Sequence, residues 1–158
     1  MKTLNKMKVL FKETQKFRQL WLWILLLSSS FVPIYLIYKD SRENSFSNDH
    51  LLTIIIFVSV ILLLWFSTLE TIITEKYIQV KYFPFVNKTF QLNDIKFMKV
   101  IDYGFVGGWG IRFWTKYGTV YNTSGSKGLH IKLATGKSYV IGTQKPEELQ
   151  RIINQLNT

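Results

Sequence analysis

The chain has 158 residues, a formal net charge of +10 and no cysteine. The lack of cysteine excludes disulfides, thiolate zinc sites and cysteine nucleophiles. Its two histidines, His50 and His130, are far apart in the sequence, so neither a histidine metal site nor a cofactor is predicted.

Residues 1–19 form a basic, amphipathic segment. Apolar residues recur there at spacings compatible with one face of a helix, and lysines largely fill the other face. The pattern predicts a surface helix in the plane of a membrane, with basic side chains contacting anionic lipid headgroups. The candidate headgroup contacts are Lys6, Lys8, Lys12, Lys16 and Arg18. The sequence is equally compatible with the alternative that these charges only set the topology of the chain.

Residues 20–38 and 51–69 are two stretches without a charged side chain. A helix rises about 1.5 Å per residue, so each stretch would span roughly 28 Å, close to the hydrocarbon thickness of a bilayer. We therefore predict two transmembrane helices, with a local kink at Pro33 in the first. Because neither stretch contains an ionisable side chain, a transporter or channel is not favoured.

The distribution of basic residues predicts the topology. Residues 1–18 contain six lysines and arginines, whereas the loop 39–50 contains two. By the positive-inside rule, both termini are expected in the cytoplasm and the loop outside. The chain is therefore predicted to be a two-span protein of the cell membrane.

Residues 70–158 are predicted to form one cytoplasmic domain of short strands followed by a helix. Alternating apolar residues and turn signals place strands near 77–83, 88–91, 95–103, 111–114, 119–122, 129–133 and 138–142. The helix signal begins with Thr143 as a candidate cap and Pro146 in the first turn. Its apolar stripe, expected to be buried, is Leu149, Ile152, Ile153 and Leu156.

A series of short motifs follows this order of strands and helix. They are Leu92, Asp94 and Ile95 (L-x-D-I), residues 107–112 (G-G-W-G-I-R), Tyr121 and Asn122 with Ser124 and Gly125, residues 135–137, residues 141–143 and residues 146–149. In these motifs the chain resembles bacterial pleckstrin-homology-like (PH-like) domains attached to small membrane hairpins. The resemblance implies a membrane α-helical hairpin plus an α+β domain, with a bent antiparallel sheet or barrel of about seven strands capped by the C-terminal helix.

Basic and aromatic residues occur together in the second half of this domain. The candidate ligand or partner surface consists of Trp109, Arg112, Lys116 and Lys127, because such residues can bind an anionic headgroup or stack on a planar group. The alternative, which we favour, is that the tryptophans pack against the sheet while the cations remain solvated. The glycine-rich residues 104–110 precede a predicted strand rather than a helix, which indicates a tight turn and not a phosphate cradle.

The sequence therefore favours a membrane-tethered, non-enzymatic binding or scaffold module. Its PH-like domain would face a protein or peptide partner at the inner leaflet, as a subunit of a membrane assembly or as a homo-oligomer. A second hypothesis is an anionic-lipid sensor that uses the basic N-terminal helix and the domain surface. A membrane-associated enzyme is a less favoured third hypothesis, since no nucleophile–base pair is displayed, and nucleic-acid binding is not expected.

Overall fold

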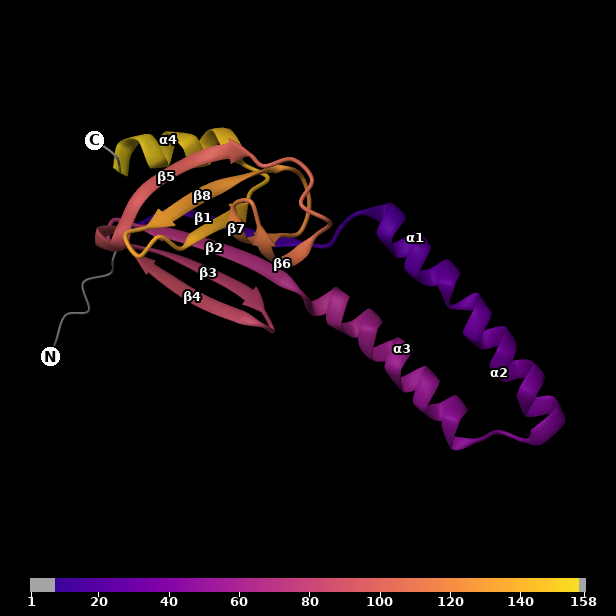
Figure 1. The fold of residues 1–158 in the computed structure, drawn as a ribbon. Coiled ribbons are helices and arrows are strands. Elements are labelled where there is room, and N and C mark those ends of the chain that lie inside the picture. The colour runs from indigo at the N-terminus through magenta and orange to yellow at the C-terminus, as the bar shows by residue number, and fades with distance from the viewer. Residues whose placement is uncertain (1–7, 157–158) are drawn as a thin grey trace, which may run out of the picture. The chain divides into compact units, whose positions relative to one another are not determined.

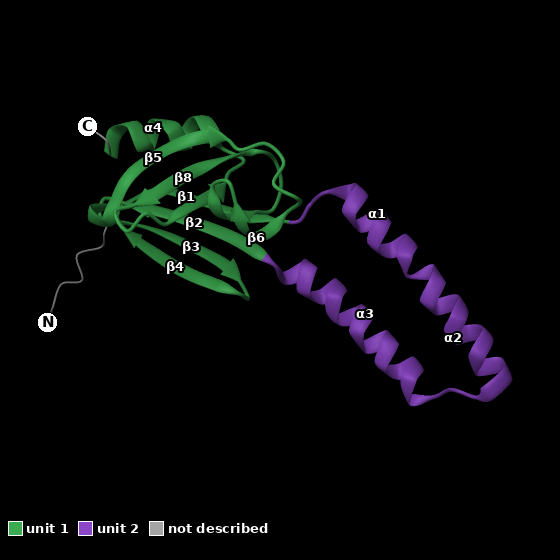
Figure 2. Ribbon diagram, viewed as in Figure 1, with its two compact units in different colours: residues 1–16, 68–158 green, residues 17–67 purple. Residues whose placement is uncertain are grey.

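The computed structural model describes residues 8–156; residues 1–7 and 157–158 lie outside the described residues. The chain divides into two compact units (Figure 2). One unit, here called the hairpin, comprises Phe17–Ser67, and the other, here called the sheet domain, comprises Met1–Lys16 with Thr68–Thr158. The hairpin is therefore an insertion into the sheet domain and not an N-terminal appendage to it.

The hairpin consists of helices α1 (Leu20–Ser29), α2 (Phe31–Asn44) and α3 (Asn48–Phe66). The segments Leu20–Asn44 and Asn48–Phe66 are each long and apolar enough to cross a membrane. The first is interrupted at Ser30, as the kink prediction for Pro33 implies, because proline has no N–H to donate to the carbonyl four residues earlier. On the loop side both helices run past the predicted spans, so residues 45–47 alone lie between α2 and α3. At its other end the predicted span 51–69 is too long, because α3 ends at Phe66 and Thr68 and Leu69 belong to a strand.

The first sheet consists of β1 (Val9–Lys16), β2 (Thr68–Thr74), β3 (Tyr77–Phe83) and β4 (Val86–Gln91), in the spatial order of the chain (Figure 1). All three pairings are antiparallel. Because side chains alternate between the two faces of a strand, β3 turns Ile78, Val80 and Tyr82 inward and a more exposed row outward, whereas the inward row of β1 includes polar side chains.

The predicted amphipathic helix at the N-terminus is wrong for residues 9–16, which form strand β1. Phe11, Glu13 and Gln15 point into the domain, whereas Lys12 and Lys16 lie on the exposed face. A spacing of four residues, as between Lys12 and Lys16, fits one face of a strand as well as one face of a helix, and pairing with β2 selects the strand. Of the other predicted headgroup contacts, Lys8 is exposed before β1, Arg18 lies outside the helices and strands, and Lys6 lies outside the described residues.

Two buried polar side chains hold β1 in the domain. The Glu13 carboxylate accepts hydrogen bonds from Thr143 Oγ1 at 2.6 Å and from the Gln144 N–H at 2.8 Å. Gln15 Nε2 donates to the Gly142 carbonyl at 2.7 Å. The strand before the hairpin is thus joined to the last strand and to the start of the C-terminal helix, more than 120 residues later.

The second sheet consists of β5 (Ile95–Asp102), β6 (Gly110–Thr115), β7 (Gly118–Asn122), β8 (Lys127–Leu133) and β9 (Ser138–Gly142). Their spatial order is β5-β8-β9-β7-β6, and a 3-10 turn, Leu92–Asp94, precedes β5. The pair β7–β9 is parallel, whereas the other pairs are antiparallel. The predicted α+β class is confirmed, but residues 8–156 form two separate sheets of four and five strands, not a closed barrel of antiparallel strands.

Helix α4 (Pro146–Leu156) lies at the end of the chain, with Leu149 and Ile153 fully buried. Ile152 and Leu156 are half-buried, so the predicted stripe is confirmed at its centre and partly exposed at its margin. Strong helix-starting signals and an apolar stripe are local features, which is why α4 was predictable.

The inner faces of the two sheets meet in the core: the rings of Phe90 on β4 and Tyr139 on β9 lie 4.9 Å apart.

Candidate functional site

The β6–β7 hairpin carries most of the predicted ligand surface. Its turn is closed by Thr115, whose Oγ1 donates to the Gly118 carbonyl and accepts from the Tyr117 N–H. Gly118 has φ +82, and a Cβ there would lie 2.1 Å from the Ser138 carbonyl oxygen. Only glycine therefore fits this position, where the β6–β7 hairpin lies against β9.

Two exposed aromatic side chains lie side by side on β6. Phe113 is 58% exposed and Trp114 is 97% exposed, with their ring centroids 5.9 Å apart. Trp114 has φ +55, and the pairing of β6 with β7 shifts register between Arg112 and Thr115. This irregularity interrupts the alternation of inward and outward side chains, which places both rings in solvent. A strained, exposed tryptophan is a feature that clusters at functional sites.

Arg112 lies at the start of this surface but bends back onto its own loop. Its Nη2 donates to the Trp109 carbonyl at 3.0 Å, and its guanidinium occupies the space where a Cβ on Gly108 would be. Within the described residues, Arg112 Nε is buried without a hydrogen-bond partner. The glycine-rich turn thus accommodates an arginine side chain.

The guanidinium also acts on a buried phenol nearby. Burial raises the pKa of Tyr82 to about 12, and the charge of Arg112 opposes that rise. Tyr82 lies on β3 of the first sheet, so this arginine acts between the two sheets. Its place indicates a structural role in addition to any contact with a ligand.

The remaining predicted residues are divided between two regions. The ammonium of Lys116 lies 5.0 Å from the centroid of the Tyr117 ring, next to the exposed pair. Lys127 is on β8, opposite Asp102 on β5, and β7 and β9 separate β8 from β6. The structure therefore brings Trp109, Arg112 and Lys116 together at the β6–β7 hairpin and places Lys127 elsewhere in the sheet.

We call Phe113, Trp114, Lys116 and Tyr117 the aromatic surface. Phe113 and Trp114 were not among the predicted site residues, because strand alternation alone does not reveal which tryptophan of the region is exposed. The positive φ of Trp114 accompanies the register shift between β6 and β7, and no residue type in β6 indicates this shift. The favoured expectation that the tryptophans of this region pack against the sheet is wrong for Trp114, which is almost fully exposed.

His130 on β8 is half-buried beside this surface. Its Nε2 lies 2.6 Å from Ser138 Oγ, and the rings of Phe97 and Tyr117 contact it edge-on. Burial lowers the pKa of His130, and the charge of Lys132 lowers it further. A neighbouring cation opposes protonation, which is the reverse of what a carboxylate does for the histidine of a catalytic triad.

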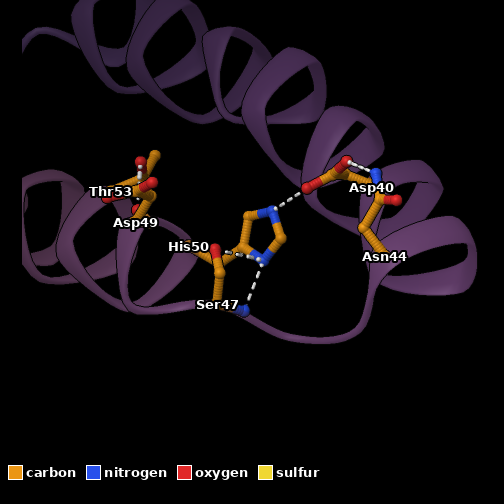
Figure 3. A network of polar contacts seen from close by, with 6 residues as sticks. All are labelled: Asp40, Asn44, Ser47, Asp49, His50 and Thr53. Carbon is orange, nitrogen blue, oxygen red and sulfur yellow. Dashed lines mark hydrogen bonds and ion pairs between the residues drawn. The ribbon is translucent and has the colours of Figure 1, made fainter.

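A second polar cluster closes the turn of the hairpin (Figure 3). The Ser47 N–H donates to His50 Nδ1 at 3.1 Å, and His50 Nε2 lies 2.8 Å from Asp40 Oδ2. Since Nδ1 accepts, Nε2 carries the proton and donates to the carboxylate. The Ser47 side chain accepts from the His50 backbone, which makes this a capping box at the start of α3. The cluster thus joins α2 to α3.

A cavity of about 460 Å³ adjoins this cluster, lined by Pro33, Leu36, Ile37, Lys39, Asp40, Glu43, His50 and Thr53. Within residues 8–156, no group of three or more histidine, cysteine, aspartate or glutamate side chains is arranged to hold a metal ion. The polar contacts that line the cavity are explained by helix capping and by the link between α2 and α3.

Comparisons with known proteins add no relative from which a function could be transferred. No family model, curated protein or solved structure matches the chain significantly. The functional argument therefore depends on the geometry described above.

Proposed function

We propose that the chain is a membrane-anchored, non-enzymatic binding module whose sheet domain faces the cytoplasm. The two apolar helices support the anchor, and the excess of basic residues before the first helix supports the orientation. The partner is a protein or peptide, bound as part of a membrane assembly or as a second copy of the chain. The observation that carries the proposal is the exposed pair Phe113 and Trp114.

Tryptophan and tyrosine supply much of the binding energy at protein interfaces, because a large rigid ring is desolvated at little entropic cost. The aromatic surface combines both residue types with the cation of Lys116. An anchored module also meets its partner at a raised effective concentration, so a small surface suffices.

We also propose that the sheet domain is PH-like. Two sheets followed by a C-terminal helix with buried Leu149 and Ile153 support this assignment. Two features differ from the expected arrangement. The pair β7–β9 is parallel, whereas an antiparallel sheet was expected, and the hairpin is inserted after β1, whereas the whole domain was expected to follow it. Because one fold serves many partners, this assignment does not identify the ligand.

The lipid-sensor hypothesis has less support at its proposed basic residues. Lys12 Nζ lies 3.0 Å from Glu70 Oε1, and Lys81 Nζ lies 3.8 Å from the other oxygen of the same carboxylate. The outer face of the first sheet is therefore a mixed-charge row. A mixed row attracts anionic lipid less strongly than a helix with one basic face would.

Photo-crosslinking at position 114 tests the proposed partner surface. With a benzophenone amino acid in place of Trp114 in the full chain in cells, we expect an ultraviolet-dependent protein adduct. The same amino acid at Thr135, an exposed position in the β8–β9 turn, is the control and should give no such adduct. An adduct of twice the mass of the chain would identify a homo-oligomer. Equal labelling at both positions would contradict the proposed surface.

Cysteine accessibility tests the topology, and the cysteine-free chain needs no background substitutions. In intact cells an impermeant thiol reagent should label Glu43→Cys, at the turn of the hairpin, and should not label Lys137→Cys, in the sheet domain. Permeabilising the cells should expose the second site. Labelling of Lys137→Cys in intact cells would reject the cytoplasmic location.

A further inference from the structure

The turn between β3 and β4 presents two phenylalanines to solvent. Phe83 is 57% exposed and Phe85 is 56% exposed, with Pro84 between them. The turn is ordered by a hydrogen bond of 2.7 Å from the Phe85 N–H to the Tyr82 carbonyl. A short turn between polar strand faces has no need of exposed aromatic rings for its own geometry, since turn-forming residues are typically small or polar.

This turn lies at the end of the sheet where the chain leaves for the hairpin and returns from it. Lys16, the last residue of β1, pairs with Thr68, the first residue of β2, and Thr68 pairs with Phe83. Helix α1 begins four residues after Lys16, and α3 ends two residues before Thr68. A fully extended chain limits these separations to about 14 Å and about 7 Å.

We propose that Phe83 and Phe85 insert into the headgroup region of the leaflet from which the hairpin emerges. The inference rests on the proposed membrane anchor. The short connections hold this end of the sheet next to the bilayer surface, where aromatic rings and basic side chains are favoured together. The exposed Lys16 and the exposed Arg18, two residues later, supply the basic component. The occupant is lipid, because the chain itself brings the bilayer to these rings.

Nitroxide labels on single cysteines in the full chain test the insertion. The protein is reconstituted into vesicles of phosphatidylcholine and phosphatidylglycerol, and collisions with oxygen and with a water-soluble nickel complex are measured. The labelled variants are Phe85→Cys, Glu75→Cys in the β2–β3 turn at the opposite end of the same sheet, and Val58→Cys within α3. We expect a several-fold higher ratio of oxygen to nickel collisions at position 85 than at position 75, and the highest ratio at position 58.

Three other results would overturn the inference, and the third variant separates it from the anchor. If position 58 is shielded from nickel but position 85 is as exposed as position 75, the anchor stands and the insertion is rejected. If positions 58 and 85 are both exposed to nickel, both proposals fail. If position 85 is shielded from oxygen and nickel alike, a protein surface covers the turn instead of lipid.

Discussion

Replacing residues 17–67 with the dipeptide Asn-Gly is expected to give a soluble domain that folds without the hairpin. Lys16 and Thr68 are neighbours in an antiparallel ladder, and a two-residue turn is the commonest way to join such neighbours. The resulting chain keeps both sheets and α4. Cooperative thermal unfolding followed by circular dichroism is the measurement.

The matched comparison is a chain that begins at residue 70, where the sequence alone would place the start of the domain. It lacks β1 and the first two residues of β2, and with them the buried side chains of Phe11, Glu13, Gln15 and Leu69. Loss of one buried phenylalanine side chain typically costs about 3–5 kcal/mol, whereas a whole domain has about 5–15 kcal/mol of stability. We expect this chain to aggregate or to melt without cooperativity. Equal melting temperatures for the two chains would show that β1 and the start of β2 are dispensable.

The N-terminal strand illustrates why the sequence misled at this point. Within residues 9–16 the apolar and basic positions fit either regular structure, so the local pattern does not decide between them. The decision comes from β2, which follows only after the whole hairpin. The prediction assigned residues 1–19 to the membrane-associated part of the chain. It therefore left β1 out of the sheet in which this strand pairs with β2.

Where a signal was local, the prediction was successful. The apolar length of the two hairpin helices and the helix-starting Pro146 required no distant partner. The candidate site was predicted only in part. Sequence reasoning placed Trp109 and Arg112 in one region, but the bulge that exposes Trp114 depends on how β6 meets β7. A register shift between strands is a tertiary feature, so the composition of β6 could not reveal it.

The burial of the Glu13 carboxylate was also not predictable from the local sequence, because a single acid among lysines is typical of a solvent-exposed face. In the structure its two oxygens accept from Thr143 and from the Gln144 backbone, just before α4 begins at Pro146. A carboxylate near a helix start is favoured by the helix dipole, and here it also joins the first strand to the last helix. Removing it should therefore affect the whole domain.

Glu13→Ala is expected to destabilise the hairpin-free domain by about 3 kcal/mol or more, because two hydrogen bonds to a charged group are lost and the buried hydroxyl of Thr143 loses its acceptor. For a domain of this size that corresponds to a fall of about 12 °C or more in melting temperature. Lys12→Ala is the matched control on the adjacent, outward position of β1. It removes an exposed ion pair with Glu70, so its effect should stay below about 1 kcal/mol. Glu13→Gln, which keeps the shape and one acceptor, should fall between the two. Equal losses for Glu13→Ala and Lys12→Ala would show that β1 is held by backbone pairing with β2 alone, and not by its buried link to Thr143 and Gln144.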